Sequence, residues 1–534
     1  MDQLALFFLL LLGTIVTVPL GDRLGLPAPV LMTILGGLGA MAPFVPAVDV
    51  PPEFILPLVL PPLLYSAVQR TSWRQFTANM RPIMLLAVAL VFVTTAAVAA
   101  VAHAIVPGLP VAAAVALGAL VAPPDPVAAT AVAGKLGLPR RMVSILEGEG
   151  LFNDVTAIVV YHVAVAAVLT GTFSVAGAGL ALVLSAVVAL AVGLAVGFTA
   201  NKAIGRLDDP TLQIGLTLLV PFVAYLIAEE FEGSGVLAVL VCALFLAEYA
   251  SDADDVFGRL AAQTFWEVVE TIVTGLAFGL IGLELSLLFG AVRDDWYRML
   301  GAAATVVAVV VGVRLLWLLP ATWVTRWLHG RDGAHDEAEE IPVSWRETVV
   351  MWWSGMRGVA TVALAVALPL TLDDGKPFPG RDWMLFIAFA VVLSTLVVQG
   401  LTLPWLVGRL GVTADSAAER DLERELALRV TAAAKRRLKE ISEAEDMADD
   451  AYELLHRRAV EMGVRISPDI VDEERREHHR ERLQWAKRAQ SVHAEMLSAA
   501  RHEVLDARSE PGADPEVVDR VLRQLDVRSL RGGG

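Results

Sequence analysis

The chain has 534 residues, of which 56% are hydrophobic, and its formal net charge at pH 7 is -16. This apolar share is too large for the cores of soluble domains alone, so the composition predicts a polytopic membrane protein. The single cysteine, Cys242, excludes an intrachain disulfide and a thiolate metal site, and redox chemistry is therefore not expected.

Apolar stretches long enough to cross a bilayer, which takes about 17 to 25 residues, recur through the first 410 residues. They predict an all-α polytopic fold with about 13 transmembrane helices. The first stretch lacks the basic segment of a secretory signal peptide, so we interpret it as a retained helix. The predicted spans are 3 to 20, 28 to 45, 53 to 68, 82 to 106, 110 to 133, 140 to 169, 174 to 200, 209 to 230, 233 to 249, 263 to 289, 296 to 328, 344 to 371 and 382 to 410.

Basic residues are distributed unevenly between the predicted loops. One set of alternate loops holds 13 Lys and Arg residues, and the other set holds only four, namely Arg293, Arg298, Lys376 and Arg381. Because Lys and Arg accumulate on the cytoplasmic side, we expect a multi-pass protein of the plasma (inner) membrane with its N-terminus outside. An odd number of spans then places the C-terminus in the cytoplasm.

The fifth span is interrupted by the segment Pro123 to Pro126, in which Asp125 stands between prolines. Proline removes a backbone donor and disfavours helix in the preceding residue, so the helix should unwind here. Unwound backbone at membrane depth is tolerated where it is buried or lines a cavity, and transporters use such breaks as cation sites. The segment therefore predicts an ion site at Asp125, with the alternative that the prolines only kink a packed helix.

The sixth span contains the pair Asn153 and Asp154 between apolar residues. An ionisable group at that depth costs about 2.5 to 3.5 kcal/mol on insertion scales, which makes it a functional-site hypothesis. Glu149, on the same helix, is a candidate counter-ion for the intramembrane arginines Arg314 and Arg357, because a buried unpaired charge costs several kcal/mol. The alternative is that Glu149 is solvated at the cytoplasmic rim.

The twelfth span is interrupted in turn by the segment Ser354 to Thr361, in which two glycines flank Arg357. The fifth and twelfth spans hold matching positions if spans one to six and eight to thirteen are repeats. Paired interruptions in two halves are a good sequence indicator of a transport site. Hydropathy alone leaves open whether such repeats are inverted.

From about Gly411 the sequence becomes highly charged, with acidic and basic residues at helical spacing. This pattern is typical of solvated helices with mutual ion pairs, so residues 411 to 534 are predicted to form a cytoplasmic helical tail. Its histidines would permit pH sensing, or they are ordinary surface residues. They are His456, His478, His479, His493 and His502.

Four motifs together resemble the sodium/proton antiporters of the NhaP and NHE type. The segment Glu149 to Asp154 is similar to the family signature E-S-x-x-N-D, and Asp125-Pro126 to its T-D-P signature. The segment Pro61 to Tyr65 resembles the family's third-helix motif, and the segment Gly355 to Gly358 resembles its G-x-R-G motif. The resemblance covers about residues 1 to 410, in matching order, and identifies the chain as a bacterial member.

This resemblance implies inverted six-helix repeats, a homodimer, and elevator-type movement of a core domain against a dimerisation domain. The core would comprise about residues 82–169 and 296–410, and the dimerisation part about 1–68 and 174–289. No cofactor and no nucleic acid are expected. The transported species would be H+ and a monovalent cation, most simply Na+, with K+ or Li+ as alternatives.

Transferred residue by residue, the resemblance makes Asp154 the carboxylate that binds the cation and the proton, with Asp125 supporting it. Asn153 would replace the second aspartate of electrogenic relatives. Glu149 would pair with Arg314 in a structural ion pair, with Arg357 close to the twelfth-helix break.

Three residues depart from the family pattern and bear on the choice of cation. Gly150 replaces the signature serine, Pro124 replaces the threonine before the aspartate, and Ser66 follows the third-helix motif where some members carry an acidic residue. Each change removes or alters an oxygen ligand in the lining of the site. The chemistry expected is competition of proton and cation for Asp154, which predicts electroneutral one-for-one exchange.

Other classes of function remain as alternatives. A K+/H+ antiporter would share the same fold, whereas a channel would need a filter loop that the sequence lacks. A primary pump would need a phosphate-binding loop of the Walker type, which is absent from the sequence. An ion-binding membrane sensor would show no flux. We therefore expect a secondary transporter and no enzyme.

Overall fold

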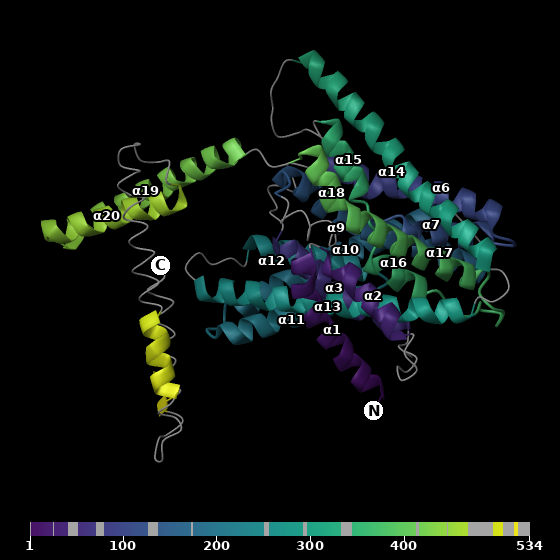
Figure 1. Cartoon of the computed structure of the whole chain (residues 1–534), viewed down its shortest axis with the longest axis horizontal. Helices are drawn as coiled ribbons and strands as arrows, with labels where there is room; N and C mark the ends of the chain where they lie inside the picture. The colour runs from purple at the N-terminus through teal and green to yellow at the C-terminus, as the bar shows by residue number, and fades with distance from the viewer. Residues whose placement is uncertain are drawn as a thin grey trace. The chain divides into compact units, whose positions relative to one another are not determined.

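The computed structural model describes residues 2–24, 26–40, 52–70, 80–125, 137–171, 175–249, 256–291, 296–332, 344–412, 416–445, 447–467, 495–505, 517–518 and 520–521. Within these residues the protein is helical, with one isolated antiparallel bridge between Thr371 and Pro377 (Figure 1). The prediction of an all-α fold is confirmed. The chain divides into two compact units, Met1–Ala414 and Asp415–Gly534.

The first unit contains the predicted apolar spans, and each span has a helical counterpart. The number of these helices that cross a membrane stays a prediction. In chain order they are α1 (Asp2–Leu24), α2 (Ala28–Ala40), α3 (Pro52–Arg70), α5 (Met80–Met84), η1 (Leu85–Ala89), α6 (Leu90–Ile105), α7 (Val111–Val121), α9 (Arg140–Thr170), α10 (Val175–Ile204), α11 (Pro210–Glu230), α12 (Gly235–Tyr249), α13 (Val256–Ala291), α14 (Trp296–Asp332), α15 (Trp345–Trp353), α16 (Val359–Val366), α17 (Arg381–Ser394), η2 (Thr395–Gln399) and α18 (Gly400–Leu410).

Seven of the described helical segments are long and apolar enough to span a bilayer. Several of their large apolar side chains point away from the protein, such as Phe8, Phe198 and Leu316, which are 59%, 61% and 70% exposed. A soluble protein would bury such residues, whereas a bilayer solvates them. The surface of this unit is therefore suited to lipid, and the chain is a multi-pass membrane protein.

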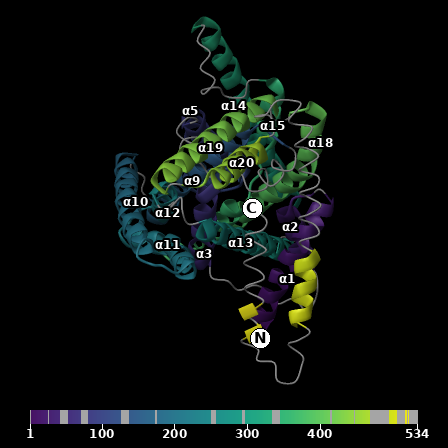
Figure 2. The same cartoon turned by 90° about the vertical axis from the view of Figure 1, so that its left-hand side faces the viewer.

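Close helix packing in this unit depends on small residues. A Cβ added at Gly36 of α2 would lie 2.3 Å from the carbonyl oxygen of Gly279 in α13, and one added at Gly118 of α7 would lie 2.4 Å from that of Thr95 in α6. Glycine at these positions lets the two backbones approach, as is common where helices pack within a membrane. Figures 1 and 2 show α10, α11 and α12 as a further group of adjacent helices.

Both predicted interruptions are real breaks in helices. Helix α7 ends at Val121, and its chain continues in irregular structure through Asp125. The twelfth span, predicted as one segment, is two short helices, α15 and α16, separated by the residues 354–358. The amide of Asp125 donates a hydrogen bond of 2.7 Å to the Met356 carbonyl, so the two breaks touch through their backbones.

Two longer helical rods each contain one turn of π-helix. The turn η1 joins α5 to α6, and the turn η2 joins α17 to α18. A π-turn adds a residue to the helical ladder and is frequent at functional sites. The side chain of Thr395, the first residue of η2, contacts the break between α15 and α16.

The second unit has the helical character that its charge pattern predicts. Helices α19 (Ser416–Glu445) and α20 (Asp449–Ile466) pack against each other and bury a narrow apolar seam that includes Leu438 and Val464. Exposed ion pairs lie on the surface of these two helices, such as Arg429–Glu425 with 2.5 Å between nitrogen and oxygen, and each contributes little stability. His478, His479 and His493 lie outside the described residues.

Candidate ion-binding site

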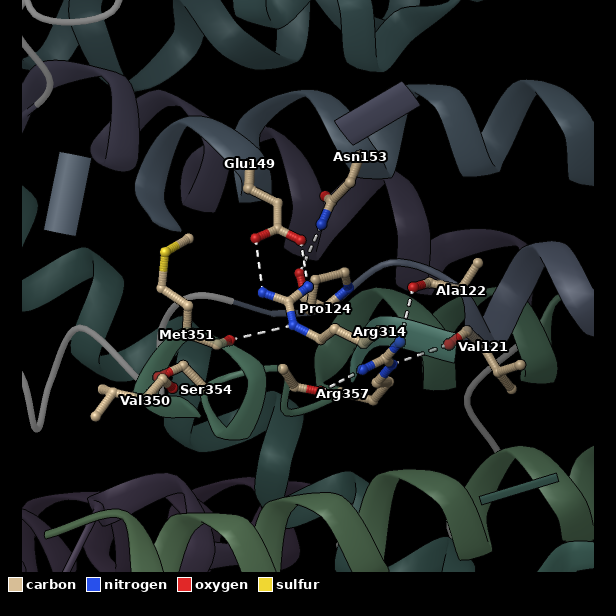
Figure 3. Close-up of polar contacts among 11 residues, drawn as sticks. Val121, Ala122, Pro124, Glu149, Asn153, Arg314, Val350, Met351, Ser354 and Arg357 are labelled. Carbon is tan, nitrogen blue, oxygen red and sulfur yellow. Dashed lines mark hydrogen bonds and ion pairs between the residues drawn. The ribbon is translucent and has the colours of Figure 1, made fainter. Parts of the chain in front are cut away.

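The carboxyl end of α7 is capped by an arginine from the other break. The Arg357 Nε donates to the Val121 carbonyl at 3.0 Å, and its Nη2 donates to the Ala122 carbonyl at 3.0 Å (Figure 3). A third contact joins Nη1 to the Gly355 carbonyl. A cation at a helix C-terminus compensates both the unpaired carbonyls and the negative end of the helix dipole.

The amino end of α16 contacts a carboxylate, that of Asp125. Its first amide, that of Val359, donates to Oδ2 of Asp125 at 3.2 Å. Gly358 makes this approach possible, because a Cβ added there would lie only 1.6 Å from the same carboxylate oxygen. Asp125 therefore compensates the positive end of one half-helix, as Arg357 compensates the negative end of the other.

A buried ion pair links α9 to α14 beside the breaks. Glu149 and Arg314, which sequence reasoning paired, contact each other through both carboxylate oxygens, and the Nη2–Oε2 distance is 2.8 Å. The two side chains are only 1% and 2% exposed, and Nε of Arg314 also donates to the Met351 carbonyl at 3.2 Å. Glu149 is thus not solvated at a rim, which removes that alternative.

Arg357 takes no part in this ion pair among the described residues. Arg357 was expected in a structural ion pair with Glu149 and Arg314, but its guanidinium is satisfied by backbone carbonyls instead. Helix breaks expose such carbonyls, and a guanidinium with five donors can satisfy several of them at once. Its charge therefore has no carboxylate partner within hydrogen-bonding distance in the described part of the chain.

Asn153 ties α9 to the first break. Its Nδ2 donates to the carbonyl oxygen of Pro124 at 2.7 Å, while its side chain is fully buried. The Asn153 Oδ1 is buried without a hydrogen-bond partner among the described residues. Pro124, which replaces a threonine of the family pattern, thus offers a carbonyl oxygen although it has no side-chain hydroxyl.

Asp154 follows Asn153 on α9 and is partly exposed. No hydrogen bond or ion pair joins its carboxylate to another described residue. Asp154 is next to Asn153 in the sequence, and Asn153 bonds to the residue before Asp125, so the two aspartates belong to the same small region of the core. Two carboxylates that repel each other, one of them without a protein partner, form an arrangement that a cation or a proton would stabilise.

Two residues expected in the lining make no side-chain hydrogen bond to the carboxylates or arginines of this arrangement among the described residues. Gly150 is buried on α9 and has no side-chain oxygen. The Ser66 hydroxyl donates to the Leu63 carbonyl of its own helix at 2.9 Å. Their lining role stays a prediction. No group of three or more His, Cys, Asp or Glu side chains in the described residues could hold a metal ion, so a cation here would rely on two carboxylates and neutral oxygens.

Sequence reasoning missed the carbonyl ligands of the arginines and the contact made by Thr395. The amide of Arg357 donates to Oγ1 of Thr395 at 3.1 Å. A threonine in an apolar span is common, and nothing in its neighbourhood distinguishes it. The signal that could have found it is the break itself, because unwound amides in a membrane require acceptors.

Comparison with known proteins gives the family of the chain. The transmembrane sodium/hydrogen exchanger family matches residues 7–409. The chain is 32% identical over 392 residues to the sodium, potassium, lithium and rubidium/H(+) antiporter of Bacillus pumilus, a match that covers 71% of this chain and 58% of that protein. It is 31% identical to the Na(+)/H(+) antiporter ApNhaP of Aphanothece halophytica, over 73% of this chain and 71% of the relative.

A solved structure shares the fold. The sodium proton antiporter MjNhaP1 of Methanocaldococcus jannaschii superimposes with a TM-score of 0.60 at 18% identity, over 77% of this chain and 99% of that one. The family match and the relatives show that the chain belongs to the sodium/hydrogen exchanger family of membrane-spanning antiporters, whose members are secondary transporters and not enzymes.

Proposed function

We propose that this protein exchanges one monovalent cation, Na+, for one proton across the plasma membrane, and that both ions compete for Asp154. The observation that carries the proposal is the Asp154 carboxylate, which has no hydrogen-bond or ion-pair partner among the described residues. It stands next to Asn153, which bonds to the first helix break beside Asp125, where the two breaks meet. An ionised Asp154 offers a cation a charged ligand. Protonation removes that charge, and the cation leaves.

The charge count of the core supports one-for-one exchange. The described site residues include two guanidiniums, Arg314 and Arg357, and three carboxylates, Glu149, Asp125 and Asp154, so with all five ionised their net charge is 2 - 3 = -1. One proton or one monovalent cation neutralises this cluster. Asn153 stands next to Asp154 and adds no further exchangeable charge. Both loaded states are then neutral, and the cycle moves no net charge.

The site residues come from a subset of the helices, which supports alternating access by movement of a core. They lie on or between α7, α9, α14, α15 and α16, and hydrogen bonds connect these segments to one another. Helices α1 to α3 and α10 to α13 would form the stationary part, through which two copies would associate. In this scheme the N-terminus lies outside and the tail in the cytoplasm.

The identity of the transported cation depends most on the residues in which this chain differs from the family pattern. Gly150 and Pro124 supply no side-chain oxygen, and the Ser66 hydroxyl is bonded within its own helix. K+ is the second candidate, because the Bacillus pumilus relative is named as an antiporter of sodium, potassium, lithium and rubidium. A site with fewer fixed oxygen ligands imposes less selectivity by cavity size.

Everted membrane vesicles test the proposal directly. Addition of NaCl, KCl or LiCl should collapse an imposed pH gradient in vesicles with the natural chain, and Asp154→Asn should abolish the effect for every cation. Collapse at the natural rate in Asp154→Asn would overturn the assignment of that carboxylate. In proteoliposomes, an exchange rate that depends on membrane voltage would reject the one-for-one stoichiometry.

A further inference from the structure

One peptide group in the second break is held on both of its edges. Its carbonyl, that of Met356, accepts the hydrogen bond of 2.7 Å from the Asp125 amide. Its amide, that of Arg357, donates to Oγ1 of Thr395 at 3.1 Å. A peptide group is planar and rigid, so a rotation that moves the N–H also moves the C=O.

Thr395 is well suited to fix this peptide. It is 1% exposed, and its own hydroxyl proton is directed at the Val391 carbonyl one turn earlier, at 2.7 Å. The oxygen therefore presents a lone pair to the Arg357 amide. The residue begins the π-turn η2, where an irregular ladder interrupts an otherwise regular helix.

The other edge of the peptide leads to the ion site. Through the Met356 carbonyl it fixes the backbone of Asp125, whose carboxylate is held in turn by the Val359 amide at 3.2 Å. Asp125 is thus positioned by two hydrogen bonds to residues on either side of Arg357. The one side chain that anchors the backbone amide of Arg357 comes from a different span.

We propose that Thr395 is a positioning residue for the cation site, acting through the Met356–Arg357 peptide on Asp125. The inference rests on the proposed function, because it assigns Asp125 to the cation site. Loss of the hydroxyl would leave the Arg357 amide buried without an acceptor, which is costly in a membrane. The peptide would rotate toward another partner, and the Met356 carbonyl would no longer hold Asp125.

The matched variants are Thr395→Val, which keeps the branched shape without the acceptor, and Thr395→Ser, which keeps the acceptor. Ser394→Ala is the control, because among the described residues the neighbouring hydroxyl bonds only to the Ala390 and Val391 carbonyls of its own helix. We expect the apparent KM for Na+ to rise about five- to tenfold in Thr395→Val. The maximal rate, the Thr395→Ser variant and Ser394→Ala should all stay near natural values.

Hydrogen exchange of the full-length chain in detergent provides a readout that does not depend on transport. Peptides covering residues 354–361 should exchange about five- to tenfold faster in Thr395→Val only. Natural exchange rates in that variant would overturn the inference, and so would faster exchange with an unchanged KM. If the natural chain transports no cation, the proposed function fails, and with it the role of Thr395 at a cation site, while hydrogen exchange still shows separately whether the anchor exists.

Discussion

Replacement of Gly358 by alanine perturbs the ion site by a single methyl group. The added Cβ would lie 1.6 Å from the Asp125 Oδ2, whereas ordinary contact begins at 3.4 Å, so the oxygen must retreat by 3.4 - 1.6 = 1.8 Å. That movement breaks its hydrogen bond of 3.2 Å with the Val359 amide. A hydrogen bond to a charged group contributes about 1.5 to 3 kcal/mol, which corresponds to roughly 10- to 100-fold in affinity.

We therefore expect Gly358→Ala to raise the apparent KM for Na+ by at least about tenfold in everted vesicles. Gly312→Ala in α14 is the matched control, because a Cβ there meets nothing within 4 Å. Its KM should equal that of the natural chain. Natural transport by Gly358→Ala, at an equal amount of protein in the membrane, would refute the reasoning that Asp125 must lie against the start of α16.

Two further predictions concern ion pairs at different depths. Glu149→Gln leaves the Arg314 guanidinium buried without its carboxylate. We therefore expect a loss of about 3 to 5 kcal/mol in the free energy of unfolding, measured in detergent. A loss below about 1 kcal/mol would contradict a buried pair. In the loop before α17, hydrogen bonds from Lys376 hold the pKa of Asp374 below its ordinary value. A carboxylate with a depressed pKa stabilises the folded protein above the pKa of the unfolded state, and this stabilisation is lost as the pH falls through the folded pKa. Any difference in the free energy of unfolding between Asp374→Asn and the natural chain should therefore vanish in acid. Transport at pH 7 should be unchanged in this variant.

Much of the fold can be predicted from the sequence because lipid imposes simple requirements. A helix in a bilayer must be apolar over about 20 residues, so the spans are visible, although α13 and α14 are longer than the spans predicted for them. Proline chemistry locates the first break at Pro124 for the same local reason. The second break is less visible, because glycine only weakens a helix.

The partners within the site are harder to predict, since they depend on contacts between distant segments. Glu149 could be proposed as a counter-ion for Arg314 or Arg357, because a buried carboxylate and a buried guanidinium require each other, and the family resemblance selected Arg314. Arg357 could not be placed in the same way, because its partners are carbonyls that any residue could supply. Neither π-turn has a sequence signature here, and the role of Thr395 therefore follows only from the structure.

The bond from Asn153 to the Pro124 carbonyl has a thermodynamic consequence. It joins the break to the helix that bears Asp154, and the bonds of Arg314 and Arg357 join α14 and the second break to the same cluster. In the proposed elevator scheme, the site would therefore cross the membrane as one unit. A cation then meets the same ligands on arrival as on departure. Its intrinsic affinity should then be equal on the two faces, so an exchanger of this kind should run in either direction with a similar apparent affinity, while the two concentration gradients set which direction is taken.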